Sequence, residues 1–314
     1  MSEQRTLASV AYETKGKVTR RERFLAEMDA VIPWATLLAL VAPHYAVPGR
    51  GRRPLPLETM LRVYFLQQWF DLSDPQAEDM LYDSESMRRF ARVELSEDTV
   101  PDESTILRFR HLLEQHQLTA QMFDAVKQLL IDKRLLLKAG TIVDATIIAA
   151  PSSTKNATRT RDPEMTQTRK GQQWYFGMKV HVGTDTRGLV HSITTTDAAT
   201  ADITQLPQLL HGEESTLFGD KAYYKADDKQ HWEAEGGTYR VNKSGKRTSQ
   251  TDRYNAARSR VRARGEHVFR VVKCAWGFTK VRYRGLTKNT TRVLITFALA
   301  NLYQVRHRLA PQGT

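Results

Sequence analysis

The spacing of apolar side chains divides the chain into two parts. From residue 19 to about residue 139, apolar positions recur every three or four residues, which predicts amphipathic helices. The expected helices cover residues 19–45 (with a break near Pro33), 57–70, 76–82, 84–92, 101–115 and 118–137. Arg108 and Arg110 should lie on the exposed side of the helix over 101–115. Such short, closely spaced helices suit either a DNA-binding domain or a bundle that serves as a dimer platform.

At Gly140 the pattern changes to runs rich in β-branched residues, which predict strands. Strands are expected over 141–148, 174–185, 188–195, 215–220 and 238–242. Helices are expected over 203–210, 225–235, 259–273 and 289–308, and residues 150–173 read as a long loop because they are almost all polar. The predicted fold is an α/β mixed sheet flanked by helices, preceded by an all-α domain. The predicted boundaries are a flexible tail at 1–18, a helical DNA-binding or dimerisation domain at 19–139, and an α/β domain at 140–314.

The net charge of the chain indicates which class of partner it binds. The chain has 314 residues and a formal net charge of +12, which favours a polyanionic partner. Nucleic acid is the usual one, and an anionic membrane surface is the rival. The loop at 45–56 carries prolines, glycines and three arginines, and it is either a strap across phosphates or an ordinary solvated loop. Cys274 is the single cysteine, which excludes a disulfide within the chain. No apolar signal core or membrane-length segment is present, so we expect a soluble protein.

One predicted helix has two chemically distinct faces. Val261, Val268, Phe269, Val272 and Trp276 form an apolar stripe, and a second face carries Ser259, Arg262, Glu266, Arg270 and Lys273. Between residues 240 and 292 there are sixteen lysines or arginines and only two acids, of which Glu266 is one. Glu266 is therefore either a helix acid in salt bridges with Arg262 and Arg270, or a metal ligand on a helix that binds phosphates.

Two further acids follow strands. Asp144 lies within a β-branched run, where aspartate is disfavoured, and Asp220 ends an apolar strand. Each is either satisfied by a turn or placed as a ligand at the active edge of a sheet. Together with Glu266, they form an oxygen-ligand set of the kind that holds Mg²⁺ for phosphodiester chemistry.

The sequence contains no motif for zinc hydrolysis, nucleoside triphosphate binding or dinucleotide binding. The sequence has no HExxH zinc motif, no GxxxxGKS/T phosphate loop and no GxGxxG dinucleotide motif. His181 and His267 lie near the candidate acids in sequence or in the expected sheet, and a structural role is the simpler reading of each.

Several stretches of the chain resemble bacterial insertion-sequence transposases of the family-five group, which are of the DDE type. These stretches are Trp174-Tyr-Phe-Gly-Met-Lys-Val-His-Val-Gly-Thr-Asp185, Phe218-Gly-Asp-Lys-Ala-Tyr223, Arg262-x-x-x-Glu266 followed by Lys273, Arg161-Asp-Pro-Glu-Met165, Lys280-Val-Arg-Tyr-Arg-Gly-Leu and Phe297-Ala-Leu-Ala-Asn-Leu302. The resemblance extends from about residue 24 to residue 308.

This resemblance implies an RNase H-like catalytic domain over residues 140–314. Its metal-holding acids fall on Asp144, Asp220 and Glu266, with two Mg²⁺ ions as the expected cofactor and Mn²⁺ able to substitute. The family has a tyrosine where this chain has Ser259, and Tyr254 is out of register with that position. Contacts to DNA are expected from seven basic residues: Lys179, Lys221, Arg262, Arg270, Lys273, Arg282 and Arg284.

The expected function is therefore a DNA transposase. Such an enzyme binds terminal inverted repeats, cleaves the ends and joins the 3′-OH to target DNA, acting as a homodimer or larger assembly on double-stranded DNA in the bacterial cytoplasm and nucleoid. Three alternatives remain open at this stage: a nuclease with the same site and no strand transfer, a DNA-binding regulator with an idle site, and a basic membrane-surface protein.

Overall fold

A computed structural model describes residues 12, 14–46, 53–155, 159–242 and 249–310 of the chain. The backbone contacts divide it into two compact units. The first unit contains residues 1–116 and 305–314, and the second contains residues 117–304. Most of the predicted tail at 1–18 and the central half of the predicted basic loop at 45–56 (residues 47–52) lie outside the described residues.

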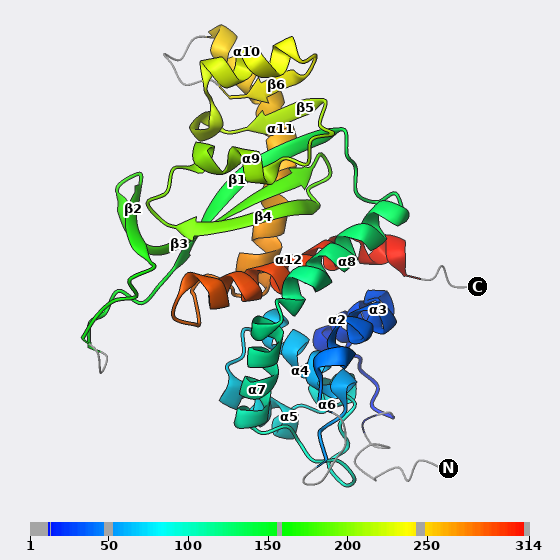
Figure 1. Cartoon of the computed structure of the whole chain (residues 1–314). Helices are drawn as coiled ribbons and strands as arrows, with labels where there is room; N and C mark the ends of the chain where they lie inside the picture. The colour runs from blue at the N-terminus through cyan, green and yellow to red at the C-terminus, as the bar shows by residue number, and fades with distance from the viewer. Residues whose placement is uncertain (1–11, 13, 47–52, 156–158, 243–248, 311–314) are drawn as a thin grey trace. The chain divides into compact units, whose positions relative to one another are not determined.

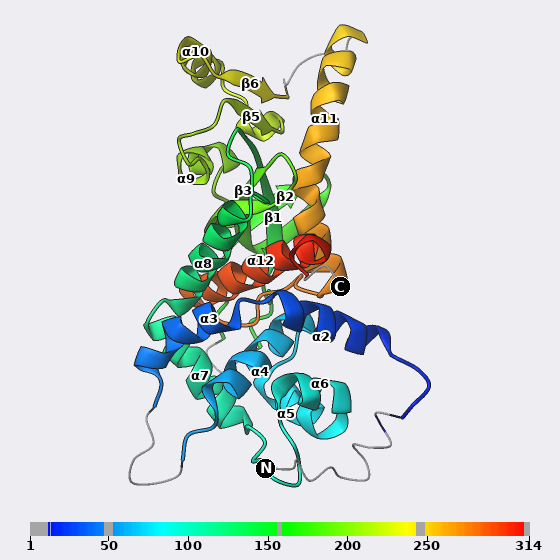
Figure 2. The same cartoon turned by 90° about the vertical axis from the view of Figure 1, so that its right-hand side faces the viewer.

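The first unit is helical, as predicted. Its elements are α2 (Arg20–Val31), α3 (Trp34–Val41), the short 3₁₀ turn Ala42–His44, α4 (Leu57–Trp69), α5 (Asp74–Asp83), α6 (Glu85–Ala91) and α7 (Glu103–Gln115). The break at Pro33 is present between α2 and α3. Helix α4 is the centre of this unit, because its residues from Thr59 to Trp69 are all buried. Figure 2 shows α2, α3, α5 and α6 arranged around α4.

The prediction that Arg110 lies on an exposed face of α7 is wrong. Its side chain is buried and forms ion pairs with Asp74 at 2.9 Å and Glu114 at 3.1 Å. Arg110 adjoins the buried Phe109, and two carboxylates supply the charge that permits its burial. Arg108 is exposed, as expected.

The second unit is built on a six-stranded sheet. The strands are β1 (Gly140–Ala149), β2 (Thr166–Lys170), β3 (Gln173–Asp185), β4 (Val190–Asp197), β5 (Thr216–Gly219) and β6 (Thr238–Val241). The helices are α8 (Leu118–Asp132), α9 (Leu206–Leu209), α10 (Ala226–Ala234), α11 (Ser249–Arg270) and α12 (Leu286–Leu309), of which the residues of α12 from 305 on belong to the first unit. The sequence prediction placed α8 in the helical domain, whereas its backbone contacts group it with the sheet. The predicted boundary at residue 140 between the helical domain and the catalytic domain stays a prediction.

The strand order matches the RNase H-like arrangement that the resemblance implied. β3 lies antiparallel between β1 and β4, while β5 and β6 continue the other edge of β1 in parallel. β1 is therefore central, with an antiparallel meander on one side and parallel strands on the other. One face of this sheet packs against α9 and α10 through an apolar cluster that includes Val143, Leu217 and Tyr223.

Strand β2 was not predicted, because its sequence Thr-Gln-Thr-Arg-Lys has no apolar residue. It pairs antiparallel with the first residues of β3, from Thr166↔Gly177 to Lys170↔Gln173, and forms a hairpin with a turn at Gly171. Its residues are partly or fully exposed, so backbone pairing rather than burial defines this strand. The part of the chain predicted as one long loop therefore contains half of a hairpin (Figure 1).

Helix α11 packs along the other face of the sheet and carries the predicted apolar stripe. Of this stripe, Val268, Phe269, Val272 and Trp276 are buried, whereas Val261 is only partly buried. Gly265 allows the close approach, because a Cβ atom there would lie 3.0 Å from Ile142 Cγ2. The helix continues into a π-helical segment at Val271–Ala275.

No single helix among the described residues is long and apolar enough to cross a membrane. By length and composition alone, the bent pair Arg20–Val31 and Trp34–His44 passes that test jointly.

Candidate active site

The two predicted aspartates lie on neighbouring parallel strands. β1 and β5 pair in register from Gly140↔Thr216 to Ile142↔Phe218. Asp144 and Asp220 each lie two residues beyond the last of these pairs. The topology therefore brings the two carboxylates to the same level of the sheet, as parallel strands with acids at equivalent positions must do.

Asp220 lies where β5 ends and the chain turns. Its side chain accepts a hydrogen bond from the Ala222 amide at 2.8 Å and caps the 3₁₀ turn Lys221–Tyr223. The side chain remains about one-third exposed, so its second oxygen is accessible. The turn that provides Asp220 with a hydrogen-bond donor thus also holds its side chain in place. A role in capping the turn is therefore compatible with a role as a metal ligand.

Helix α11 adds the third carboxylate and a guanidinium. Arg262 Nη2 lies 3.0 Å from Glu266 Oε1, and its Nη1 lies 3.9 Å from Asp220 Oδ2. Of the two salt bridges expected for Glu266, the one with Arg262 is therefore present, and the one with Arg270 is absent among the described residues. Arg262 also influences Asp144, where it lowers the pKa of the carboxyl. One guanidinium therefore interacts with all three acids.

The environment of Asp144 disfavours its negative charge. The pKa of this carboxyl is raised from 3.8 to about 6, chiefly by burial and to a smaller extent by the neighbouring charges of Asp220 and Glu266. The Ala145 amide, which donates to Asp144 Oδ1 at 2.8 Å, and Arg262 oppose that rise. Half-buried and repelled by two other acids, Asp144 is a carboxylate that a nearby cation would stabilise.

The donor set fits a hard divalent cation. All three side chains offer carboxylate oxygens, which Mg²⁺ and Mn²⁺ prefer, and no sulfur or imidazole ligand is involved. Among the residues that the structure describes, no three His, Cys, Asp or Glu side chains are close enough together to hold a metal as they stand. The guanidinium of Arg262 supplies the positive charge between the acids in this arrangement.

A cavity of about 190 Å³ opens beside Asp144 and Asp220. It is lined by Asp144, Ala145, Thr146, Ile147, Thr168, Arg169, Lys170, Lys179, Asp202 and Asp220. The turn end of the β2–β3 hairpin thus lies next to the two aspartates. Asp202 was missed in the sequence, where it lies in an ordinary polar connection before a short helix.

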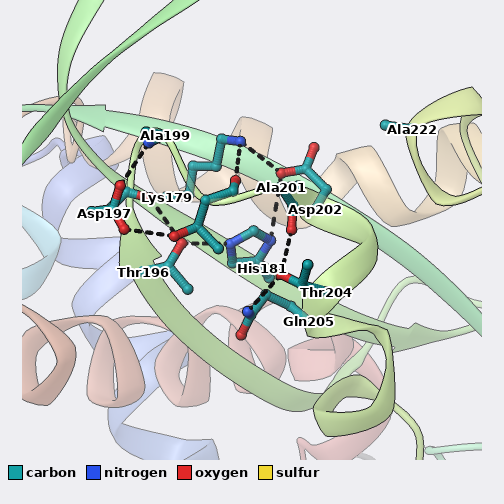
Figure 3. A network of polar contacts seen from close by, with 12 residues as sticks. Lys179, His181, Thr196, Asp197, Ala199, Ala201, Asp202, Thr204, Gln205 and Ala222 are labelled. Atoms are coloured by element: carbon teal, nitrogen blue, oxygen red, sulfur yellow. Dashed lines mark hydrogen bonds and ion pairs between the residues drawn. The ribbon is translucent and has the colours of Figure 1, made fainter.

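Asp202 begins the 3₁₀ turn Asp202–Gln205 and belongs to a polar network with side chains of β3 and β4 (Figure 3). Lys179 Nζ lies 2.9 Å from Asp202 Oδ1 and donates to the Thr200 carbonyl at 2.7 Å. His181 is fully buried, with Nε2 2.9 Å from Thr196 Oγ1, and burial lowers the pKa of its imidazole to about 4. His181 is therefore neutral and structural, as the sequence reading favoured.

Lys273 connects the π-helical end of α11 to β1. Its ammonium donates to Thr146 Oγ1 at 2.8 Å and to the Ile147 carbonyl at 2.6 Å. Burial lowers the pKa of this group, and the nearby charge of Lys170 lowers it further. In this arrangement Lys273 fixes α11 relative to the strand that carries Asp144.

The other predicted DNA contacts differ in exposure. Arg270 and Lys221 are exposed close to Glu266 and Asp220 in the chain. Arg282 and Arg284 line a separate cavity of about 190 Å³ together with Arg161. Arg284 donates to Thr160 Oγ1 at 3.1 Å, so it also supports the neighbouring loop. Contact of these residues with DNA stays a prediction.

Comparison with known proteins gives two family matches. The profile described as "Transposase DDE domain" matches residues 136–302, and the profile described as "Transposase domain (DUF772)" matches residues 12–112. The first match alone covers more than half of the chain.

Two solved structures are distantly similar. One is the crystal structure of the Mos1 strand transfer complex, with 13% identity, a TM-score of 0.29, and coverage of 84% of this chain and 79% of that chain. The other is the Mos1 transposase paired-end complex with left transposon end, with 12% identity, a TM-score of 0.21, and coverage of 75% and 83%.

Proposed function

This chain belongs to the transposase DDE domain family, and from that premise we propose that Asp144, Asp220 and Glu266 are its catalytic acids. The observation that carries the proposal is their convergence. Two neighbouring parallel strands and one helix bring three carboxylates around the guanidinium of Arg262. In a chain with a net charge of +12, such a group of acids is unusual and calls for a cationic ligand.

The three carboxylates would hold divalent metal, which enzymes of this family generally use. We take the ions to be two Mg²⁺, with Mn²⁺ able to substitute, because the ligands are all oxygen. When bound, these ions supply Lewis-acid stabilisation of the charge that develops on the attacking and leaving oxygens. Arg262 then loses its role of neutralising the acids and becomes available to a DNA phosphate.

The proposed reaction has two steps on DNA. Water attacks the phosphorus at the end of the element, breaks the P–O3′ bond and frees a 3′-OH on the transferred strand. That 3′ oxygen then attacks a phosphodiester of the target, forming a new P–O bond and releasing the target strand's own 3′-OH. The second step conserves the number of phosphodiester bonds, so no nucleotide cofactor is required.

The basic residues around the site would position the DNA backbone. Arg270 and Lys221 are exposed beside the acids, and Arg282 and Arg284 form a second basic region on the same unit. Contacts of this kind fix register on the duplex and make binding steeply dependent on salt. The helical domain would recognise the terminal repeats, and joining two ends would require at least two copies of the chain.

A joining assay tests this function. Purified protein is incubated with Mg²⁺, a pre-cut terminal-repeat duplex bearing a 3′-OH, and a supercoiled plasmid. The expected result is covalent joining of the labelled end to the plasmid. Nicking of the plasmid without joining would identify a nuclease instead, and binding without either product would identify a regulator.

A further inference from the structure

One acid beside the candidate active site has no role in the proposed chemistry. Asp202 lines the same cavity of about 190 Å³ as Asp144 and Asp220. The buried phenol of Tyr223 connects the three acids, because burial raises its pKa and the charges of all three raise it as well. Asp202 therefore lies close enough to the two aspartates to affect what binds between them.

Asp202 holds a lysine that borders the same cavity. Lys179 Nζ lies 2.9 Å from Asp202 Oδ1 and donates to the Thr200 carbonyl at 2.7 Å, so one short connection provides both anchors. His181 lies beside this pair, with Nδ1 3.8 Å from the same carboxylate oxygen (Figure 3). Burial lowers the pKa of this imidazole to about 4, so it is neutral at pH 7 and the charge of Asp202 is matched by Lys179.

The ammonium of Lys179 has more electrostatic influence than the other cations of the cavity. Its side chain is 13% exposed, whereas Arg169 and Lys170, which also line the cavity, are exposed. Charges that are partly removed from water interact more strongly, and exposed charges are screened by solvent and salt. The position of the Lys179 ammonium therefore matters most for the acids of the cavity.

An unrestrained ammonium at this place would compete with metal. Lysine carries its charge on a flexible four-carbon stem. Without Asp202, the charge of Lys179 would lose its partner in a partly buried position, next to a cavity that Asp144 and Asp220 border. Arg262 already interacts with these two acids from α11. A second cation on them would further weaken their affinity for a divalent ion.

We propose that Asp202 is a positioning residue for divalent metal. It holds the ammonium of Lys179 away from Asp144 and Asp220, so that both carboxylates remain available to Mg²⁺. The carbonyl of Thr200 supplies the second anchor for the same ammonium. The inference rests on the proposed function, in which these two aspartates hold metal.

The test is a double-mutant cycle on Mg²⁺ binding in the absence of DNA. The midpoint of Mg²⁺-dependent thermal stabilisation is measured for wild type, Asp202→Asn, Lys179→Met and the double variant. Asp202→Asn should raise this midpoint about tenfold or more, because an opposite charge close to a carboxylate changes its proton affinity by at least that factor.

The double variant separates movement of the ammonium from a change in net charge. If both charges acted from fixed positions, the effects of the two single substitutions would add. The proposal predicts instead that Lys179→Met improves Mg²⁺ binding about tenfold more in the Asp202→Asn background than in wild type, because the released ammonium is then removed.

Cleavage and a conservative variant give a second readout. Asp202→Asn should cleave a terminal-repeat duplex at close to the wild-type rate once Mg²⁺ is saturating, because its Mg²⁺ requirement is what rises. Asp202→Glu keeps the carboxylate and should retain most of the Mg²⁺ affinity. Asp227→Asn is the matched control, because it removes an exposed acid on α10 of the same unit and should leave the midpoint unchanged within about twofold.

Additive effects in the cycle would overturn the inference. So would a cleavage rate of Asp202→Asn that stays low at saturating Mg²⁺, or a wild type that shows no thermal response to Mg²⁺. Urea unfolding in EDTA checks that each variant folds, and Asp202→Ser replaces Asp202→Asn in the cycle if the latter does not. A wild type that binds Mg²⁺ but neither cleaves nor joins DNA would instead refute the proposed function, while the binding cycle still decides the role of Asp202.

Discussion

Replacing Asp144 with asparagine should stabilise the metal-free protein while abolishing its activity. Asp144 is half-buried, and its carboxylate is repelled by Asp220 and Glu266. Asparagine has nearly the same shape, keeps an oxygen that accepts from the Ala145 amide, and carries no charge. The substitution therefore removes an unfavourable charge without creating a cavity.

The size of the effect follows from the pKa. The folded protein raises the pKa of Asp144 from 3.8 to about 6, so the folded state holds its proton more tightly than the unfolded chain does. The free energy of unfolding of the wild type consequently falls as the pH rises from about 3.8 to about 6, and it stays lower above pH 6. The full loss corresponds to roughly 3 kcal/mol. Asp144→Asn should regain up to that amount at pH 8 and about half of it at pH 5.

Urea unfolding in EDTA at pH 5 and pH 8 measures the difference in free energy of unfolding between Asp144→Asn and wild type. The unfolding of the unit that contains the sheet is followed separately from that of the helical unit. Asp227→Asn is a suitable control, because Asp227 is exposed on α10 in the same unit and should change stability by less than about 0.5 kcal/mol. A variant at residue 144 that is less stable than wild type at pH 8, or whose gain does not grow with pH, would refute the electrostatic account.

The remaining predictions concern three basic side chains. Arg262→Gln should lower metal-free stability by roughly 1 kcal/mol, and Mg²⁺ should then raise the melting temperature more than it does in wild type; an equal response to Mg²⁺ would contradict the role of this guanidinium. Lys273→Met should cost about 1–3 kcal/mol in urea unfolding, because two hydrogen bonds to β1 are lost, and should leave the salt dependence of DNA binding unchanged. A salt slope reduced by about 1 would instead make Lys273 a phosphate contact. Arg110→Met should destabilise the helical unit by about 3 kcal/mol, because Asp74 and Glu114 lose their partner; a cost below 0.5 kcal/mol, by the same unfolding assay, would contradict this.

The sequence was sufficient for most elements of the fold. Helical periodicity located α2 to α8, and β-branched runs located five of the six strands. β2 was missed because it contains no apolar residue and its two threonines lie in a polar stretch that reads as a loop; the strand is held by backbone pairing with β3. Arg110 was misplaced because arginine was expected to be exposed, and its two acidic partners are supplied by tertiary structure and helix spacing.

The candidate site was only partly accessible to sequence reasoning. The unusual placement of Asp144 within a strand and of Asp220 at a strand end could be read directly. Their shared level in the sheet depends on the pairing of β1 with β5 across more than 70 residues, which spacing alone does not give. Asp202 and the β2–β3 hairpin come to lie next to these acids only in the folded chain, so no local sequence motif could have located them.

Metal-dependent cleavage by Asp220→Ala tests the central claim most directly. The variant is compared with wild type on a terminal-repeat duplex in Mg²⁺, with DNA binding measured in parallel. Loss of this carboxylate should reduce cleavage by at least about 10³-fold, or roughly 4 kcal/mol of transition-state stabilisation, while binding persists. Cleavage at the wild-type rate would contradict the assignment of Asp144, Asp220 and Glu266 as one catalytic site.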